Sequence, residues 1–236
     1  MTQVISKKRV TDHGEVFTNS REVNAMLDLV IHETERIESR FLEPACGNGN
    51  FLVEILSRKL KFVAARYSKS QLEYERYAVI AVASIYGIDL LPDNVLACQK
   101  RLFNIFNAQY TALYKSKIKV ECQSSVRYIL NRNIIHGNAL TLETVPKENK
   151  LAEPILFSEW SAVNGSMIKR RDFVYDHLVK FSEPPPPDDL FSPENIKKNI
   201  SANLKVQQSD EGDYSYHISP KKDFPLVHFL EVGNGE

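Results

Sequence analysis

Cysteine is scarce in this 236-residue chain, and its odd number of cysteines cannot all pair with one another. Cys46, Cys98 and Cys122 are also too widely spaced for a Cys-x-x-Cys metal site. These absences exclude a disulfide framework as the basis of the fold. They indicate a protein of the reducing cytoplasm, and we expect no metal centre.

Net charge and long apolar runs are missing too. Thirty Lys and Arg balance thirty Asp and Glu, which excludes a protein that holds nucleic acid through an overall positive field. Any DNA contact must then be local or come from a partner. The sequence contains no apolar run of about 18 residues, and its charged start lacks the apolar core of a signal peptide. We therefore expect no membrane association.

The apolar residues recur at helical spacing in several segments, and short apolar runs separate these segments. Such alternation is typical of a mostly parallel sheet covered by helices on both faces, so the sequence predicts a doubly wound, Rossmann-like α/β sandwich. The expected helices are 19–37, 51–60, 70–83, 92–113 and 126–130, and the expected strands are 40–43, 85–90, 133–136 and 154–157.

The character of the chain changes after Phe181. Four prolines, Pro184 to Pro187, open a polar stretch that should be extended, and two strand-like segments, 214–218 and 225–230, follow it. We expect one α/β domain over 1–182, a Pro-rich linker or surface wrap over 183–212 and a strand pair over 213–236.

Two glycines mark a candidate ligand site. Gly47 and Gly49 follow the first expected strand, where glycines let a backbone approach a ligand closely, and Asp89 ends the next strand, where a carboxylate can accept hydrogen bonds from ribose hydroxyls. A dinucleotide fold has three glycines and an acid about 20 residues further on. Here a whole helix intervenes before Asp89, which disfavours NAD.

The segment around these glycines, FLEPACGNGNF at 41–51, closely resembles the cofactor-binding motif of DNA N6-adenine methyltransferases, particularly the modification subunits of restriction systems. Three more segments resemble that family's motifs and stand in the same order. Segment 13–18 resembles the upstream motif that contacts the methionine part of the cofactor, 86–89 the ribose-binding motif and 137–140 the motif beside the adenine.

The resemblance implies S-adenosyl-L-methionine as cofactor and a class I methyltransferase sandwich with a shortened C-terminal half. Asn138 departs from the aspartate that many relatives carry beside the adenine. The cofactor-binding residues that the resemblance implies are Phe17, Thr18, Glu43, Pro44, Ala45, Gly47, Gly49, Asn50, Asp89, Leu90, Asn138 and Ala139.

The motif that performs methyl transfer in this family is missing. Relatives carry Asn, Asp or Ser followed by Pro-Pro and an aromatic residue, whose oxygens hold the target amine while the aromatic ring stacks on a flipped base. The corresponding place reads Ser158-Glu159-Trp160. Either Ser158 or Glu159 accepts the amine hydrogens and Trp160 stacks on the base, or Trp160 packs in the core and Glu159 is solvated.

The leading hypothesis is a DNA adenine methyltransferase of a restriction–modification or phage-defence system. Its partners would be DNA and a specificity or restriction subunit, because the chain has no room for a separate DNA-recognition domain. The basic clusters Lys169 to Arg171 and Lys197-Lys198 could meet phosphates. The alternatives are a catalytically inactive, S-adenosylmethionine-binding regulatory or scaffold subunit, and a methyltransferase that acts on a non-DNA substrate.

Overall fold

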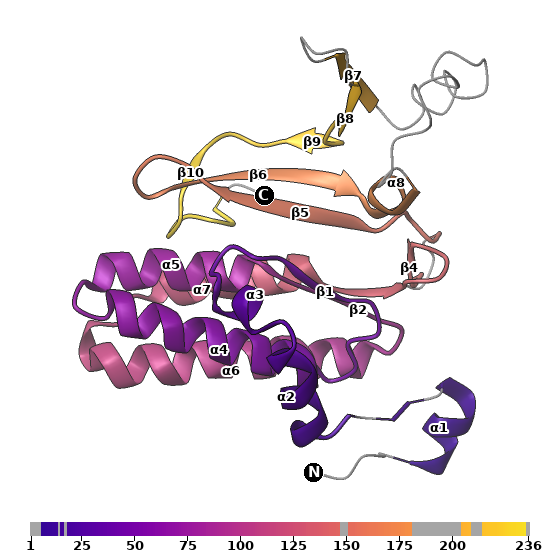
Figure 1. Ribbon diagram of the computed structural model, residues 1–236, viewed down its shortest axis with the longest axis horizontal. Coiled ribbons are helices and arrows are strands. Elements are labelled where there is room, and N and C mark those ends of the chain that lie inside the picture. The colour runs from indigo at the N-terminus through magenta and orange to yellow at the C-terminus, as the bar shows by residue number, and fades with distance from the viewer. Residues whose placement is uncertain are drawn as a thin grey trace.

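A computed structural model describes residues 6–13, 15–16, 18–146, 151–180, 204–208 and 214–234 (Figure 1). The helices are α1 (Lys7–His13), α2 (Ser20–Asp28), α3 (Ile31–Glu35), α4 (Asn50–Tyr67), α5 (Gln71–Ala83), α6 (Pro92–Tyr114), α7 (Val120–Asn133) and α8 (Tyr175–Lys180), with a 3-10 turn at Lys115–Lys117. The strands are β1 (Phe41–Glu43), β2 (Ile85–Asp89), β3 (Ile134–Asn138), β4 (Glu143–Thr144), β5 (Leu156–Ala162), β6 (Met167–Val174), β7 (Leu204–Gln208), β8 (Tyr214–Ile218), β9 (Lys222–Asp223) and β10 (Val227–His228).

The first sheet has the strand order β1-β2-β3-β4. The pairs β1–β2 and β2–β3 are parallel, with Leu42 opposite Tyr86 and Asp89 opposite His136, and β4 runs antiparallel to β3. Helices α4 to α7 connect and contact these strands. The parallel strands and their helices confirm the α/β class, while the complete doubly wound sandwich stays a prediction.

A second sheet is built on the hairpin of β5 and β6, which lies over α5 and α7 (Figure 1). The sequence predicts a strand at 154–157 that would belong to the parallel sheet, and this is wrong in extent and in partner. The strand β5 begins at Leu156 and pairs antiparallel with β6. Gly165, with a φ of 68°, lies in the turn that reverses the chain between the two strands.

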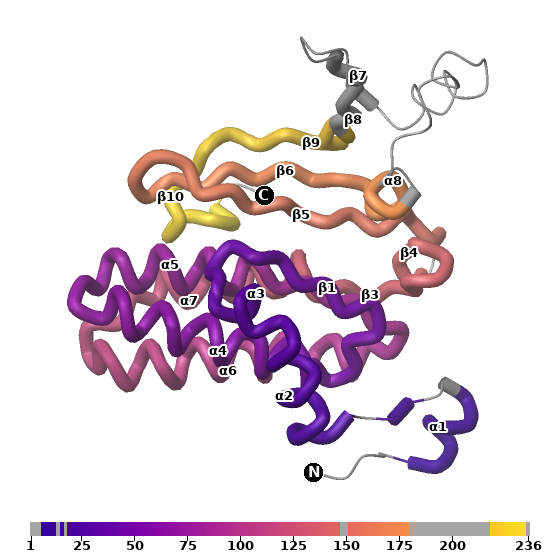
Figure 2. The backbone as a smooth tube through the Cα atoms, in the orientation of Figure 1, coloured from indigo at the N-terminus to yellow at the C-terminus, as the bar shows by residue number. Residues whose placement is uncertain are grey.

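The C-terminal strands join different sheets. Figure 2 shows β9 and β10 beside the hairpin, where both pair with β6, whereas β8 pairs with β7. The sequence predicted a strand pair within 213–236, and the structure gives its strands partners outside that segment. The expected linker, 183–212, lies outside the described residues apart from β7, and the domain boundaries stay predictions.

The predicted helix over 19–37 is two helices, α2 and α3. Asn19 caps α2 through its side chain, but α2 ends at Asp28 and Val30 takes a non-helical φ of −121°. The resulting turn brings the carbonyls of Arg36, Ile37 and Ser39 onto the ammonium group of Lys59, which is fully buried in α4. These carbonyls follow the end of α3, so helical hydrogen bonds do not use them and they can accept from Lys59.

The main core lies among α4, α5, α6 and α7, where apolar residues repeat at helical spacing. Leu52, Leu56, Leu60 and Val63 of α4 are all fully or almost fully buried. Trp160 of β5 belongs to the same cluster, so the second sheet closes the core that the helices begin.

Candidate cofactor site

A cavity of about 570 Å³ opens at the C-terminal ends of β1, β2 and β3, the edge at which open parallel sheets bind ligands. Ten of the twelve predicted cofactor-binding residues line it. Of the other two, Gly49 does not line it and Phe17 lies outside the described residues. The lining residues are Glu15, Val16, Thr18, Glu43, Pro44, Ala45, Cys46, Gly47, Asn50, Phe51, Asp89, Leu90, Leu91, Asn94, Gly137, Asn138, Ala139 and Leu140.

The glycine loop between β1 and α4 is held from behind. Gly49 takes a left-handed φ of 87°, and a Cβ atom added to it would lie 2.5 Å from the Sγ atom of Cys98 in α6. The Gly49 amide donates to the Cys46 carbonyl at 2.8 Å. Gly49 therefore packs closely against α6, on the side of the loop that faces away from the cavity. Its neighbours Gly47 and Asn50 line the cavity.

Asp89 is fixed by protein donors. Its Oδ2 accepts from the Gly47 amide at 2.8 Å, and its Oδ1 accepts from the Leu91 amide at 2.9 Å and from Nδ2 of Asn94 at 3.1 Å. A carboxylate offers about four acceptor positions. These three hydrogen bonds orient Asp89 and leave it capacity for a further donor.

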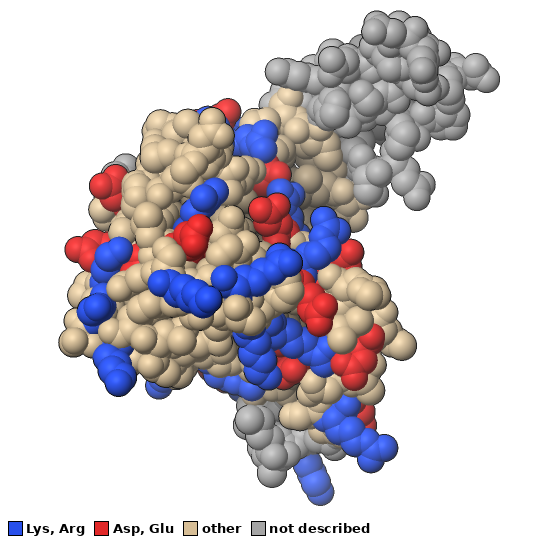
Figure 3. Space-filling view, turned by 60° about the vertical axis from the view of Figure 1, so that its left-hand side comes forward, with Lys and Arg blue, Asp and Glu red and all other residues tan. Residues whose placement is uncertain are grey.

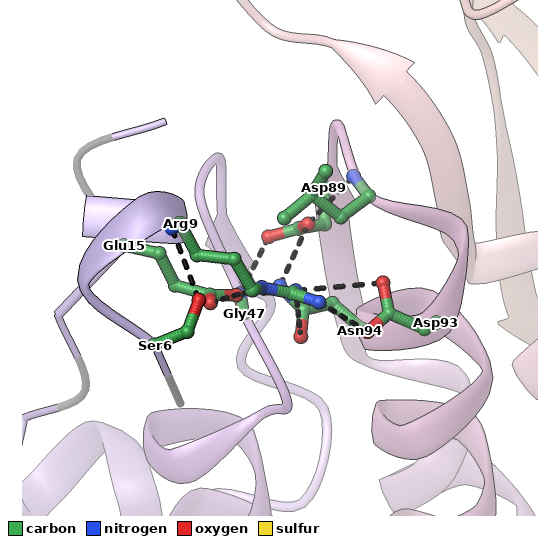
Figure 4. A network of polar contacts seen from close by, with 8 residues as sticks. Ser6, Arg9, Glu15, Gly47, Asp89, Asp93 and Asn94 are labelled. Atoms are coloured by element: carbon green, nitrogen blue, oxygen red, sulfur yellow. Dashed lines mark hydrogen bonds and ion pairs between the residues drawn. The ribbon is translucent and has the colours of Figure 1, made fainter. Parts of the chain in front are cut away.

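A polar network connects Asp89 to the N-terminal helix (Figure 4). Asn94 also donates to Oε1 of Glu15 at 2.6 Å, and Arg9 of α1 pairs with Glu15 at 2.5 Å and with Asp93 at 2.6 Å. The hydrogen bond from Arg9 is the largest cause that lowers the pKa of Glu15 and likewise that of Asp93. Sequence reasoning missed this network.

Arg101 of α6 braces the loop from another direction. Its guanidinium donates to the Asn48 carbonyl at 2.7 Å and to Oδ1 of Asn50 at 2.8 Å, and Nδ2 of Asn50 donates to the Thr18 carbonyl at 2.9 Å. The interval of seven residues from Asn94 to Arg101 is two helical turns. This interval on the helix that follows Asp89 is the sequence signal that could have found both side chains.

The charges that line the cavity are negative. Glu15, Glu43 and Asp89 line it, and none of its described lining residues is Lys or Arg. Burial is the main cause that raises the pKa of Glu43, whose other influence is a hydrogen bond from the Ala45 backbone. A cationic ligand would counter this cost, because an opposite charge stabilises a buried carboxylate. The cavity is therefore suited to a ligand with positive charge.

None of the three predicted catalytic residues lines this cavity. The Ser158 hydroxyl donates to Asp172 at 2.7 Å, Glu159 forms ion pairs with other residues, and the buried Trp160 donates from Nε1 to Asn133 at 3.0 Å. These contacts place them in the second sheet and its packing. Their catalytic role stays a prediction.

The first predicted basic cluster is engaged within the protein. Lys169 pairs with Asp223 at 2.5 Å, Arg171 pairs with Glu159 at 2.7 Å, and Arg170 is buried against Asp172 at 2.7 Å. Figure 3 shows Lys and Arg scattered over one face with Asp and Glu among them. The cluster Lys197-Lys198 lies outside the described residues.

The part of the chain that the structure describes contains no group of three or more His, Cys, Asp or Glu residues that could hold a metal ion. None of the described helices is long and apolar enough to span a membrane.

Fold and cavity together define an α/β protein with a cavity at the C-terminal edge of parallel strands. Comparison with protein families matches residues 17–153, more than half of the chain, to the MmeI DNA-methyltransferase domain. The chain belongs to this family of DNA methyltransferases of the restriction–modification type. No curated protein and no solved structure matches it.

Proposed function

We propose that the chain is an S-adenosylmethionine-dependent methyltransferase of the DNA adenine-N6 type, acting in restriction–modification or phage defence. The observation that carries the proposal is the cavity itself, in which four separate sequence segments meet around three carboxylates. Its volume lies within the range of roughly 300–1,000 Å³ that small-molecule sites occupy.

The residues present fit this cofactor. Asp89 would accept from a ribose hydroxyl, and Glu43 with its buried carboxyl group would stabilise the positive charge of the methionine end. Thr18 would contact the methionine part, and Asn138 and Ala139 would lie beside the adenine. The cofactor supplies an electrophilic methyl group when bound. The chain binds and orients it, with Arg9 and Arg101 holding the loops that carry these residues.

Calorimetric titration of the full chain with S-adenosylmethionine tests cofactor binding. We expect saturable one-to-one binding that Asp89→Asn weakens, because an amide cannot replace the carboxylate toward Gly47, Leu91 and a ribose hydroxyl together. Asp28→Ala, at an exposed aspartate of α2, should leave binding unchanged, and NAD should not bind. Absence of binding to a chain with a normal thermal transition would refute the proposal.

DNA methylation is tested with methyl-labelled cofactor and duplex DNA, followed by identification of the methylated base. N6-methyladenine is expected. Ser158→Ala, Glu159→Ala and Trp160→Ala test the predicted catalytic residues, since activity that survives all three changes would exclude them.

A second function is favoured by a specific observation. Ser158, Glu159 and Trp160 all engage other protein groups and lie outside the cofactor cavity. A chain that binds the cofactor and leaves the acceptor site to another subunit would act as a regulatory or scaffold component. Cofactor binding without methyl transfer by the isolated chain would favour this function.

A further inference from the structure

One edge of the strand β1 has no neighbouring strand among the described residues. Among these residues the strand pairs only with β2, and its Phe41 amide donates to the Ser84 carbonyl at 3.0 Å. Successive residues of a strand direct their backbone groups to opposite sides. Leu42, next to Phe41, therefore turns its N–H and carbonyl away from β2, which is the arrangement that can accept another strand.

Apolar surface flanks this edge on both faces of the sheet. On one face a cavity of about 430 Å³ is lined by Leu42, Leu178 and Val179 together with aromatic rings. On the other a cavity of about 230 Å³ is lined by Met26 and Val30. These five side chains are 36% to 56% exposed. Side chains that alternate along an added strand would enter the two cavities in turn.

A half-exposed arginine, Arg40, stands at the start of this edge. Glu159 is shared by two guanidinium groups, those of Arg40 at 2.5 Å and Arg171 at 2.7 Å. Arg40 immediately precedes β1, and its side chain is 55% exposed. One carboxylate cannot neutralise both cations, so the edge is complementary to a strand that bears an acidic residue.

The position of the edge connects it to the cofactor cavity. In doubly wound sheets the next strands along the chain lie on the far side of the first strand, so the strand order reverses there. Ligands bind in the crevice at this reversal. Parallel strands are normally buried between neighbours. A strand added parallel to β1 would end beside Pro44 and Gly47, both of which line the cofactor cavity.

We propose that the β1 edge binds one β-strand of a separate polypeptide, with alternating apolar side chains and a carboxylate beside Arg40. The added strand completes the sheet and brings the partner's groups to the acceptor side of the cofactor. The second of these roles, at the acceptor side of the cofactor, rests on the proposed function and on the doubly wound class. The docking surface itself rests on Leu42, Val30, Val179 and Arg40.

A fluorescein-labelled peptide, Asp-Val-Ile-Val-Ile-Val, is a suitable probe for the full chain. We expect saturable binding that slows hydrogen exchange at the Leu42 amide. Val179→Asp and Val30→Asp, one for each cavity, should each weaken binding about tenfold or more by placing a charge on apolar surface. Val120→Asp is the matched control, because Val120 is 69% exposed at the start of α7. A peptide with Lys in place of Asp should bind Arg40→Glu better than it binds the unchanged chain.

Four results would overturn the inference. The first is no peptide binding, and the second is equal weakening by all three valine variants. The third is a dimer of the chain that Val179→Asp dissociates, since a second copy would then occupy the edge. The fourth is displacement of the peptide by a single-stranded oligonucleotide, which would assign the larger cavity to a nucleobase. Titration of the same variants with S-adenosylmethionine reports separately on the proposed function, because none of them lines the cofactor cavity.

Discussion

Gly49→Ala should destabilise the protein through two separable effects. The residue takes a φ of 87°, and its added Cβ would lie 2.5 Å from Sγ and 3.3 Å from Cβ of Cys98. A left-handed conformation costs an L-residue about 1–2 kcal/mol. Overpacking of a closed core costs about 1–3 kcal/mol more. Together they predict a loss of about 2–5 kcal/mol in the free energy of unfolding.

Two further variants separate these effects. Gly165→Ala introduces the same residue at a φ of 68° with no heavy atom within 4 Å of the new Cβ, so it should show the conformational cost alone, about 1–2 kcal/mol. Cys98→Ala removes the sulfur that the new methyl group meets. In that background the cost of Gly49→Ala should fall close to the conformational cost, because only the contact of 3.3 Å with Cβ of residue 98 remains tight.

Urea unfolding of the single and double variants measures the coupling between Gly49 and Cys98. We expect a coupling energy of about 1–3 kcal/mol, which equals the overpacking contribution. If Gly49→Ala cost the same with and without the Cys98 sulfur, close packing would not be the reason for glycine here. If it cost no more than Gly165→Ala, the loop would be able to move away from α6.

Burial lowers the pKa of Lys59 to about 7, below the pKa of this group in the unfolded chain. Between the two pKa values the unfolded state binds one more proton than the folded state does. The free energy of unfolding should therefore rise with pH from about 7 to 10. Relative to Lys59→Met, unfolding free energy should gain up to about 1.4 kcal/mol per pH unit in this window, and a constant difference would mean that Lys59 keeps its proton. Trp160→Phe should lower the free energy of unfolding, measured in urea, by about 2–4 kcal/mol, because it leaves the Asn133 oxygen without its donor and reduces the buried volume. The affinity for the cofactor, measured by titration, should be unchanged. Arg101→Met should weaken cofactor binding by releasing Asn50, and calorimetry showing unchanged affinity would limit Arg101 to packing.

The cofactor side was largely predictable because its signals are local. A glycine loop after a strand and an acid at the end of the next strand follow from the geometry of parallel sheets, and both Gly47 and Asp89 line the cavity. Asn94 and Arg101 were missed although both project from the helix that follows Asp89. Arg9 was out of reach, because nothing local indicates that α1 contacts a residue 84 positions later.

The second sheet was not predictable for a different reason. The run Pro154 to Phe157 shows only that a strand is near, and periodicity cannot say which sheet it joins or in which direction. Its place in the fold also involves contacts between distant segments, such as the T-shaped packing of Phe157 on Tyr86 of β2. The break after Asp28 was likewise not visible locally, because the segment that follows α3 places its carbonyls on Lys59, a residue far along the chain.

The boundary of the family match separates two kinds of structure. The match ends at residue 153, after the cofactor segments and before β5. The polar residues of the β5–β6 hairpin serve one another, as Ser158, Arg170 and Asp172 do through hydrogen bonds of 2.7 to 3.2 Å. Such a buried network resists reuse in catalysis, because removing one member leaves the others unpaired. Groups that hold a target amine must instead be free to accept its hydrogens. This requirement favours an acceptor side supplied by an added strand at the β1 edge, where apolar surface and the half-exposed Arg40 lie near Glu43 of the cofactor cavity.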